Sequence, residues 1–203
     1  MQSSATQAAG ELYMGLVEVG VGLIPAGGGC KEMLSRYLGD IPKSVEYDSN
    51  PFVQAAFKNI AMASVATSAE EARSMNYLRS TDRLTLDPDA LVSDAKKLAL
   101  GLAQSGYAAP KAKTFKLPGP SGRAAIELFL LSMKDGGYAT PHDVTVGKKL
   151  AHILTGGNIS GNQVVSEQHI LDLEKEAFLS LCGEEKTQER IQHMMSTGKP
   201  LRN

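Results

Sequence analysis

Apolar residues recur three and four positions apart over most of the chain after residue 30, which is the spacing of one face of an α-helix. Short runs rich in glycine, proline, serine and asparagine separate these periodic stretches. The pattern therefore predicts a mainly α-helical chain with short connections. The expected helices cover residues 31–38, 51–64, 69–76, 88–105, 123–135, 141–155, 166–182 and 187–196.

Several of the predicted helices begin with a capping signal. Ser68 stands three residues before Glu71, which is the spacing of a capping box. Three further helices are expected to begin with a capping residue followed by proline at the first helical position: Asn50-Pro51, Asp87-Pro88 and Thr140-Pro141.

Two of the predicted helices carry a clear apolar face. In 166–182 the residues expected to be buried are Ile170, Leu173, Ala177 and Leu181, and those expected to face solvent are Glu174, Lys175 and Glu176. In 88–105 the apolar face consists of Leu91, Ala95, Leu98 and Leu102.

Extended structure is expected mainly near the N-terminus. Residues 11–29 are rich in glycine and valine and poor in helix formers, so one or two short strands are predicted there. Residues 83–86 form either a short strand or an extended turn. Three prolines make 107–122 a predicted loop. A domain boundary, if the chain has one, is expected in that loop.

Composition narrows the range of functions. The chain has 203 residues, a formal net charge of −1 and two cysteines. A near-neutral balance gives no electrostatic reason to expect nucleic acid or an acidic membrane surface as a partner. Two cysteines make neither a disulfide framework nor a four-cysteine zinc site, and this usage is typical of a reducing, cytoplasmic compartment. No stretch has the roughly 20 unbroken apolar residues of a membrane span.

Glu18 is the most conspicuous candidate for chemistry, because it lies inside an apolar, glycine-rich run. Burying a carboxylate is costly and raises its pKa, which suits a general acid or base near neutral pH. The alternative is that Glu18 caps a turn or faces solvent.

The remaining candidate binding or catalytic residues each have a structural explanation as well as a functional one. Gly27–Gly29 precede a predicted helix, whose N-terminus could bind a phosphate or a thioester oxygen. The same position could lower the pKa of Cys30, although no base for a nucleophilic cysteine is apparent. The four histidines have no metal-ligand spacing, so no metal site is expected. A last group could meet the phosphates of coenzyme A or simply line a solvated loop: Lys111, Lys113, Lys116 and Arg123.

Residues 15–28, which include Val17-Glu18 and Leu23-Ile24-Pro25, resemble a signature of the crotonase (enoyl-CoA hydratase/isomerase) superfamily. Val17 stands where that signature usually has proline. The resemblance implies that Glu18 is one of two catalytic carboxylates acting on an enoyl thioester of coenzyme A. It also implies a set of residues around the substrate: Gly22, Ile24, Pro25, Gly27 and Gly28.

Residues 63–72 resemble the crotonase segment that precedes the C-terminal helices of that superfamily. Residues 166–178 and 197–203 resemble the C-terminus of bacterial multifunctional 3-hydroxyacyl-CoA dehydrogenases. The resemblance implies that residues 1–203 are a partial crotonase-like domain, with the signature in 10–40 and a helical tail in 41–203. The family's upstream oxyanion-hole amides, its first catalytic glutamate and a G-x-G-x-x-G motif are not found in the sequence. We therefore expect the C-terminal fragment of a fatty-acid β-oxidation enzyme, inactive as a hydratase in isolation and without a cofactor of its own. NAD would bind an absent N-terminal region, so the expected partners are acyl-CoA and the upstream domains of the same polypeptide.

A second hypothesis is a non-catalytic helical assembly or interaction module. The predicted helices offer enough apolar surface for a homo-oligomer. Assembly through these helices predicts a dimer or larger oligomer that survives Glu18→Gln, whereas a purely catalytic role does not require an oligomer.

Overall fold

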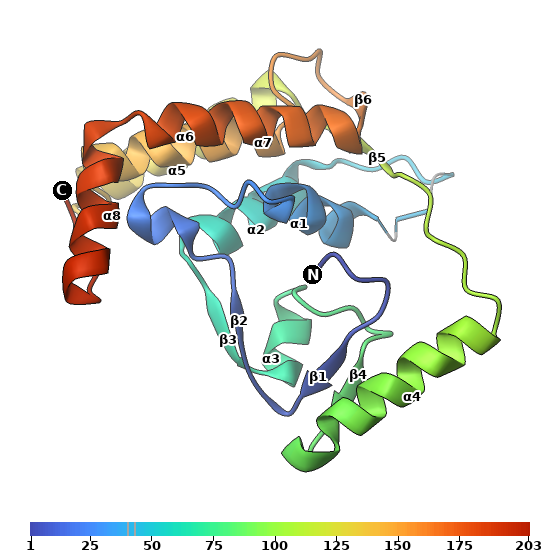
Figure 1. The fold of residues 1–203 in the computed structure, drawn as a ribbon. Coiled ribbons are helices and arrows are strands. Elements are labelled where there is room, and N and C mark those ends of the chain that lie inside the picture. The colour runs from blue at the N-terminus through green and yellow to red at the C-terminus, as the bar shows by residue number, and fades with distance from the viewer. Residues whose placement is uncertain (40, 43) are drawn as a thin grey trace. The chain divides into compact units, whose positions relative to one another are not determined.

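The computed structural model describes residues 1–39, 41–42 and 44–203. Helices contain 54% of the residues and strands 11%, so the prediction of a mainly helical chain is confirmed (Figure 1). The chain divides into two compact units. The first consists of residues 1–15 and 65–112, and the second consists of residues 16–64 and 113–203.

The first unit is built on two small β-ladders. β1 (Gln7–Ala9) pairs in parallel with β4 (Arg83–Thr85), and β2 (Glu11–Gly15) pairs antiparallel with β3 (Val65–Ser68). One or two strands were expected in residues 11–29, and one, β2, lies there, while β1 precedes that segment. Residues 83–85 are a strand rather than an extended turn. β3 was not predicted, because its partner lies about 50 residues earlier in the chain.

Two helices complete the first unit: α3 (Ala69–Ser74), and α4 (Leu91–Gln104), which follows the 3-10 turn η2 (Pro88–Ala90). Every residue of α4 is exposed or half-exposed, including the apolar face that the sequence predicted. Within its own unit α4 packs against β1.

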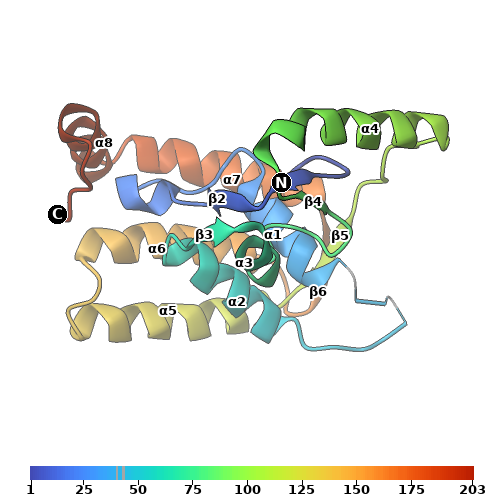
Figure 2. The ribbon, with the colours of Figure 1, turned by 90° about the horizontal axis from the view of Figure 1, so that it is seen from below.

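The second unit is a helical assembly around α6 (Pro141–Leu154). α5 (Pro120–Asp135) and α7 (Glu167–Cys182) lie on either side of α6, and Figure 2 shows the three helices in a row. α1 (Gly29–Leu38) and α2 (Asn50–Ala61) also pack against α6. The core between these helices holds several fully buried side chains: Met33, Leu34, Ile60, Leu150 and Ile153.

Two further elements shape this unit. α8 (Glu185–Thr197) contacts α7 and the 3-10 turn η1 (Glu18–Val21). β5 (Thr114–Leu117) pairs antiparallel with β6 (Gln163–Ser166). Part of the predicted 107–122 loop is therefore a strand. Pro118 follows β5 and Pro120 begins α5, so neither proline interrupts an element.

The capping predictions are confirmed in their main features. Thr140 and Asp143 form a reciprocal capping box on α6. Ser68 Oγ accepts a hydrogen bond from the Glu71 N–H at 3.1 Å. Glu71 does not return to the Ser68 amide, because its carboxylate accepts from the Thr67 N–H at 2.7 Å instead. The N-cap of α2 is Ser49, so the prediction of Asn50 was wrong by one residue.

Candidate functional site

Glu18 begins η1, three residues after β2 ends. The side chain is half-buried and makes no capping hydrogen bond. Its Oε2 is buried and accepts no hydrogen bond from the part of the chain that the structure describes. The carboxylate therefore neither caps the turn nor lies fully in solvent, and one of its oxygens has its bonding capacity unused.

Gly22 closes this turn with a left-handed backbone (φ +79°), which glycine adopts without steric cost. Thr187 of α8 donates its hydroxyl proton to the Gly22 carbonyl at 2.9 Å. His142 Nε2 lies 2.9 Å from the same hydroxyl oxygen, and because that hydroxyl proton is already used, the imidazole must be the donor. A Cβ on Gly22 would lie 2.7 Å from Thr187 Oγ1. The glycine thus allows the turn to approach α6 and α8 closely.

Burial lowers the pKa of His142, and the positive charge of Arg190 lowers it further. The imidazole is therefore neutral near neutral pH and acts as a fixed hydrogen-bond donor. His142 lies in the first turn of α6, and its imidazole is buried. The structure makes it part of the support of the Glu18 turn.

The glycine cluster after the turn leads into α1. Ile24 and Pro25 are buried, and Gly28 is the N-cap. The amides at this N-terminus are taken by Glu174, whose Oε2 accepts from Gly28 N–H at 2.9 Å and whose Oε1 accepts from Lys31 N–H at 2.7 Å. A carboxylate of the chain thus occupies the place where the sequence suggested a phosphate or thioester oxygen. The same geometry is a poor fit for a dinucleotide pyrophosphate.

Glu174 was predicted to face solvent, and that prediction was wrong: its relative exposure is 0%. The residue lies four positions after Ile170 and three before Ala177, both buried, so the helical period does place it on the inner face. Burial raises the pKa of Glu174 to about 6, although the amides of Lys31 and Gly28 and the charge of Lys31 act in the opposite direction.

Cys30 lies beside these carboxylates in the first turn of α1, with an exposure of 0%. Burial raises the pKa of its thiol well above the ordinary value, and the charges of Glu174 and Glu18 raise it further. The helix N-terminus therefore does not activate this cysteine, because its dipole is already used by Glu174. Cys30 is a buried thiol rather than a nucleophile.

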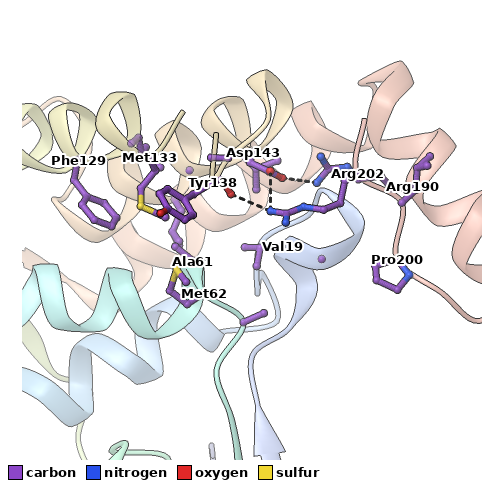
Figure 3. Close-up of a pocket in the computed structure, with 18 residues that line it drawn as sticks. Val19, Ala61, Met62, Phe129, Met133, Tyr138, Asp143, Arg190, Pro200 and Arg202 are labelled. Atoms are coloured by element: carbon purple, nitrogen blue, oxygen red, sulfur yellow. Dashed lines mark hydrogen bonds and ion pairs between the residues drawn. The ribbon is translucent and has the colours of Figure 1, made fainter. Parts of the chain in front are cut away.

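An apolar pocket of about 360 Å³ opens beside the Glu18 turn. Val19 and Gly20, the residues that follow Glu18, form part of its wall. Figure 3 shows Val19 at this position. The rest of the wall comes from the end of α2, from α5 and α6, and from a segment after α8. Most of these side chains are apolar, among them Met62, Phe129, Met133, Val146, Leu150 and Leu201.

The charged residues of the pocket wall are Asp143, Arg190 and Arg202. Arg190 Nη1 donates to Asp143 Oδ1 at 2.8 Å, and only 2% of the Arg190 side chain is exposed. Burial acts to raise the pKa of Asp143, but the Thr140 amide and the Arg190 guanidinium hold it below its usual value. The sequence offered no sign of this pair, because its members are 47 residues apart.

The basic residues considered for coenzyme A phosphates are mostly engaged within the chain. Lys113 Nζ donates to Ser35 Oγ at 2.7 Å, and Lys116 pairs with Glu46 at 2.6 Å. Arg123 Nη1 lies 2.8 Å from His152 Nδ1. Within residues 1–39, 41–42 and 44–203, no group of three or more histidine, cysteine or acidic side chains is arranged to hold a metal ion. No helix in those residues is long and apolar enough to cross a membrane.

Comparison with known proteins gives one informative relative. The chain is 45% identical over 203 residues to a probable 3-hydroxyacyl-CoA dehydrogenase of Bacillus subtilis (strain 168). The match covers 100% of this chain and 25% of that protein. No family model and no solved structure matches the chain. The chain is thus similar to about a quarter of a protein named as a 3-hydroxyacyl-CoA dehydrogenase.

Proposed function

We propose that this chain is the crotonase-like region of a fatty-acid β-oxidation enzyme that acts on acyl-CoA thioesters, and that Glu18 is its general acid or base. The observation that carries the proposal is the Glu18 carboxylate, which has one buried and unpartnered oxygen on a turn that also lines an apolar pocket. A carboxylate with free acceptor capacity beside an apolar cavity is typical of acid–base sites.

The proposed reaction is the addition of water to an enoyl thioester. The water oxygen bonds to the β-carbon, one water proton ends on the α-carbon, and the product is a 3-hydroxyacyl thioester. A carboxylate at the Glu18 position takes a proton from water or delivers one to the α-carbon. This product belongs to the class of compounds in the name of the Bacillus relative, so hydration and NAD-linked oxidation would be successive steps.

The supporting residues have separate roles in this proposal. Gly22 fixes the end of the Glu18 turn through Thr187 and His142. Ile24, Pro25, Gly27 and Gly28 shape the connection to α1 and are the proposed substrate-side residues, as the family resemblance implies. NAD and the donors to the thioester oxygen belong to other parts of the longer polypeptide, and the isolated chain is expected to have little or no hydratase activity.

The test is a chimera in which this chain replaces the matching quarter of the Bacillus protein. Hydration of crotonyl-CoA and NAD-linked oxidation of 3-hydroxybutyryl-CoA are measured in the same preparation. Glu18→Gln is expected to lower hydration at least about 100-fold, as for the loss of an acid–base group, and to leave the oxidation unchanged. The matched control is Glu185→Gln, at an exposed glutamate of α8. Equal hydration in the Glu18→Gln and control chimeras would refute the proposal.

A second candidate function is a non-catalytic assembly module. The observation that favours it is α4, whose apolar residues Val92 and Leu100 are 79% and 50% exposed. Exposed apolar surface of this kind is typical of an interaction site. Its test is whether the chain forms a dimer or a larger oligomer in solution. The catalytic proposal does not require one.

A further inference from the structure

One wall of the apolar pocket is a short segment without regular secondary structure, Lys199–Asn203, which we call the strap. Pro200, Leu201 and Arg202 of the strap line the pocket opposite α5 and α6, as Figure 3 shows for Pro200 and Arg202. A pocket of about 360 Å³ has the size of a small-molecule site, for which roughly 300–1,000 Å³ is usual.

The strap is held in place by the side chain of Asn203. Its Oδ1 accepts from Arg190 Nε at 2.8 Å, and its Nδ2 donates to the Lys186 carbonyl at 3.1 Å and to Glu189 Oε2 at 2.7 Å. A second attachment comes from Arg202, whose Nη2 donates to the Tyr138 carbonyl at 3.0 Å. Figure 3 shows this arginine reaching from the strap to the Tyr138 loop, with Asp143 beside it.

Arg190 gives this attachment its strength. Its guanidinium is almost fully buried and joins three parts of the unit: Asp143 of α6, the α6 cap Thr140, and Asn203. A buried guanidinium needs a partner for each N–H group, because an unsatisfied charged donor is costly. Asn203 supplies the acceptor for the Nε–H group. Displacing the strap would therefore leave one N–H of a buried cation without a hydrogen-bond acceptor.

The two charges of the Asp143–Arg190 pair are used within the wall, and most of the remaining lining is apolar. Asp143 and Arg190 pair, and Arg202 is bonded to the Tyr138 backbone. An occupant that brings polar atoms would find few partners, whereas a hydrocarbon chain needs none. Val19 and Gly20, the two residues that follow Glu18, belong to the pocket wall, so the pocket adjoins the turn that carries this carboxylate.

We propose that this pocket holds the aliphatic chain of the acyl thioester, and that the strap, latched by Asn203 on Arg190, sets the length of chain that it accepts. This inference rests on the proposed function for the identity of the thioester. The binding of a hydrocarbon chain, however, depends only on the pocket and can be measured without coenzyme A.

The test is isothermal titration of the 203-residue chain with butyrate, octanoate, dodecanoate and palmitate. Affinity is expected to rise about fourfold for each added methylene until the pocket is full, and then to stop rising. Ala61→Phe, which fills the pocket from the end of α2, is expected to move that plateau to shorter chains. Asn203→Leu keeps the size of the side chain but removes the latch, and is expected to move the plateau to longer chains.

Two control variants match these changes. Gln192→Leu removes an exposed amide from α8, and Ala95→Phe adds a ring to exposed α4; both are expected to keep the wild-type plateau. Circular dichroism confirms that each variant is folded. An identical plateau in the wild type, Ala61→Phe and Asn203→Leu proteins, or no binding of any fatty acid, would overturn the inference.

The two proposals fail in different ways. Chain-length dependence that responds to Ala61→Phe, together with a chimera that lacks hydratase activity, would support the pocket and refute the proposed function. Hydratase activity that depends on Glu18, with a chain-length preference unaffected by Ala61→Phe, would refute the pocket and leave the proposed function standing.

Discussion

Glu174 places a carboxylate at the N-terminus of α1, where the amides favour its charge and its burial opposes it. Two N–H donors and the charge of Lys31 stabilise the ionised form, yet the pKa is raised from 4.5 to about 6 because the side chain is cut off from water. The loss of hydration thus outweighs the helix N-terminus. The charge of Lys31 acts on Glu174, and the charges of Glu174 and Glu18 both act on the Cys30 thiol.

We predict that Glu174→Gln flattens the pH dependence of stability. The folded protein holds this proton more tightly than the unfolded chain, for which the pKa is near 4.5. The stabilising contribution of the protonated group is therefore fully present below pH 4.5 and is lost as the pH rises through about 6. The difference in unfolding free energy between wild type and variant should change by about 2 kcal/mol over this range, since one pKa unit corresponds to about 1.4 kcal/mol.

The measurement is urea unfolding at a series of pH values. Glu176→Gln, two positions along α7 at an exposed site, is the matched control and should track the wild type. A wild-type-minus-variant difference that is constant from pH 4.5 to above pH 6 would show that Glu174 titrates normally and is not buried as the structure has it.

Cys30 and Cys182 are predicted to differ sharply in reactivity. Burial and two nearby carboxylates raise the pKa of the Cys30 thiol, and burial also keeps reagents away from it. Cys182, in contrast, is half-exposed. Iodoacetamide at mildly alkaline pH should alkylate Cys182 alone in the folded chain and both cysteines in urea. Peptide mass spectrometry locates the label. Alkylation of Cys30 in the folded protein at a rate comparable to Cys182 would contradict this assignment.

At the scale of elements, the helix boundaries were the most predictable feature of the chain. Capping residues and prolines act on their own neighbours, so Thr140-Pro141 and Asp87-Pro88 specify a helix start without reference to the rest of the fold. β5 and β6 were missed because each needs a partner about 50 residues away. β5 does alternate polar and apolar residues, but over only four positions.

The candidate site was predictable in part for the same reason. Glu18 stood out because a carboxylate in an apolar run is unusual, and the glycines around it marked a tight turn. The contacts of Glu174 with Gly28 and of Thr187 with Gly22 span more than 140 residues, so they depend on how α7 and α8 pack. The helical period places Glu174 on the inner face of α7. Its charge favours the opposite prediction, because glutamate side chains usually face solvent.

The α6 cap gives a prediction at this scale. Thr140 Oγ1 accepts from the Asp143 N–H at 3.1 Å and from Arg190 Nη2 at 3.1 Å. Thr140→Ala should lower the free energy of unfolding by about 1–2 kcal/mol, because it leaves a helix-terminal amide and a buried guanidinium N–H without this acceptor. Thr140→Ser should restore most of the loss, and Thr145→Ala, on the same helix, should stay within about 0.5 kcal/mol of the wild type. Denaturant unfolding that ranks the Thr145 variant below the Thr140 variant would contradict the role of the cap.

At the scale of the whole molecule, α4 stands out because it buries none of its residues while exposing the apolar side chains Val92 and Leu100. Every residue of this 14-residue helix is exposed or half-exposed, although its sequence is amphipathic. Most helical stability in proteins comes from burying such a face. The chain also spans only a quarter of the length of its Bacillus relative. The exposed apolar side chains of α4 are therefore typical of a helix that another protein contacts. For the isolated 203-residue chain, the partner we expect is a second copy of the same chain.

We predict that the isolated chain self-associates through α4 and not through the Glu18 site. Light scattering should give a mass of at least twice 21.6 kDa for the wild type. Val92→Lys combined with Leu100→Lys should return the mass to that of one chain, because two charges replace the exposed large apolar side chains of α4, which lie outside its half-buried face. Glu18→Gln should leave the mass unchanged, because its turn belongs to the other unit.

The control for this prediction adds the same charge without removing apolar surface. Ser93→Lys combined with Gln104→Lys alters two exposed polar positions of α4 and should keep the wild-type mass. If these two substitutions also dissociate the oligomer, net charge rather than apolar surface governs the association. A wild-type mass of 21.6 kDa would rule out assembly through α4 in this chain. It would also remove the observation that favours a non-catalytic module over an enzyme region.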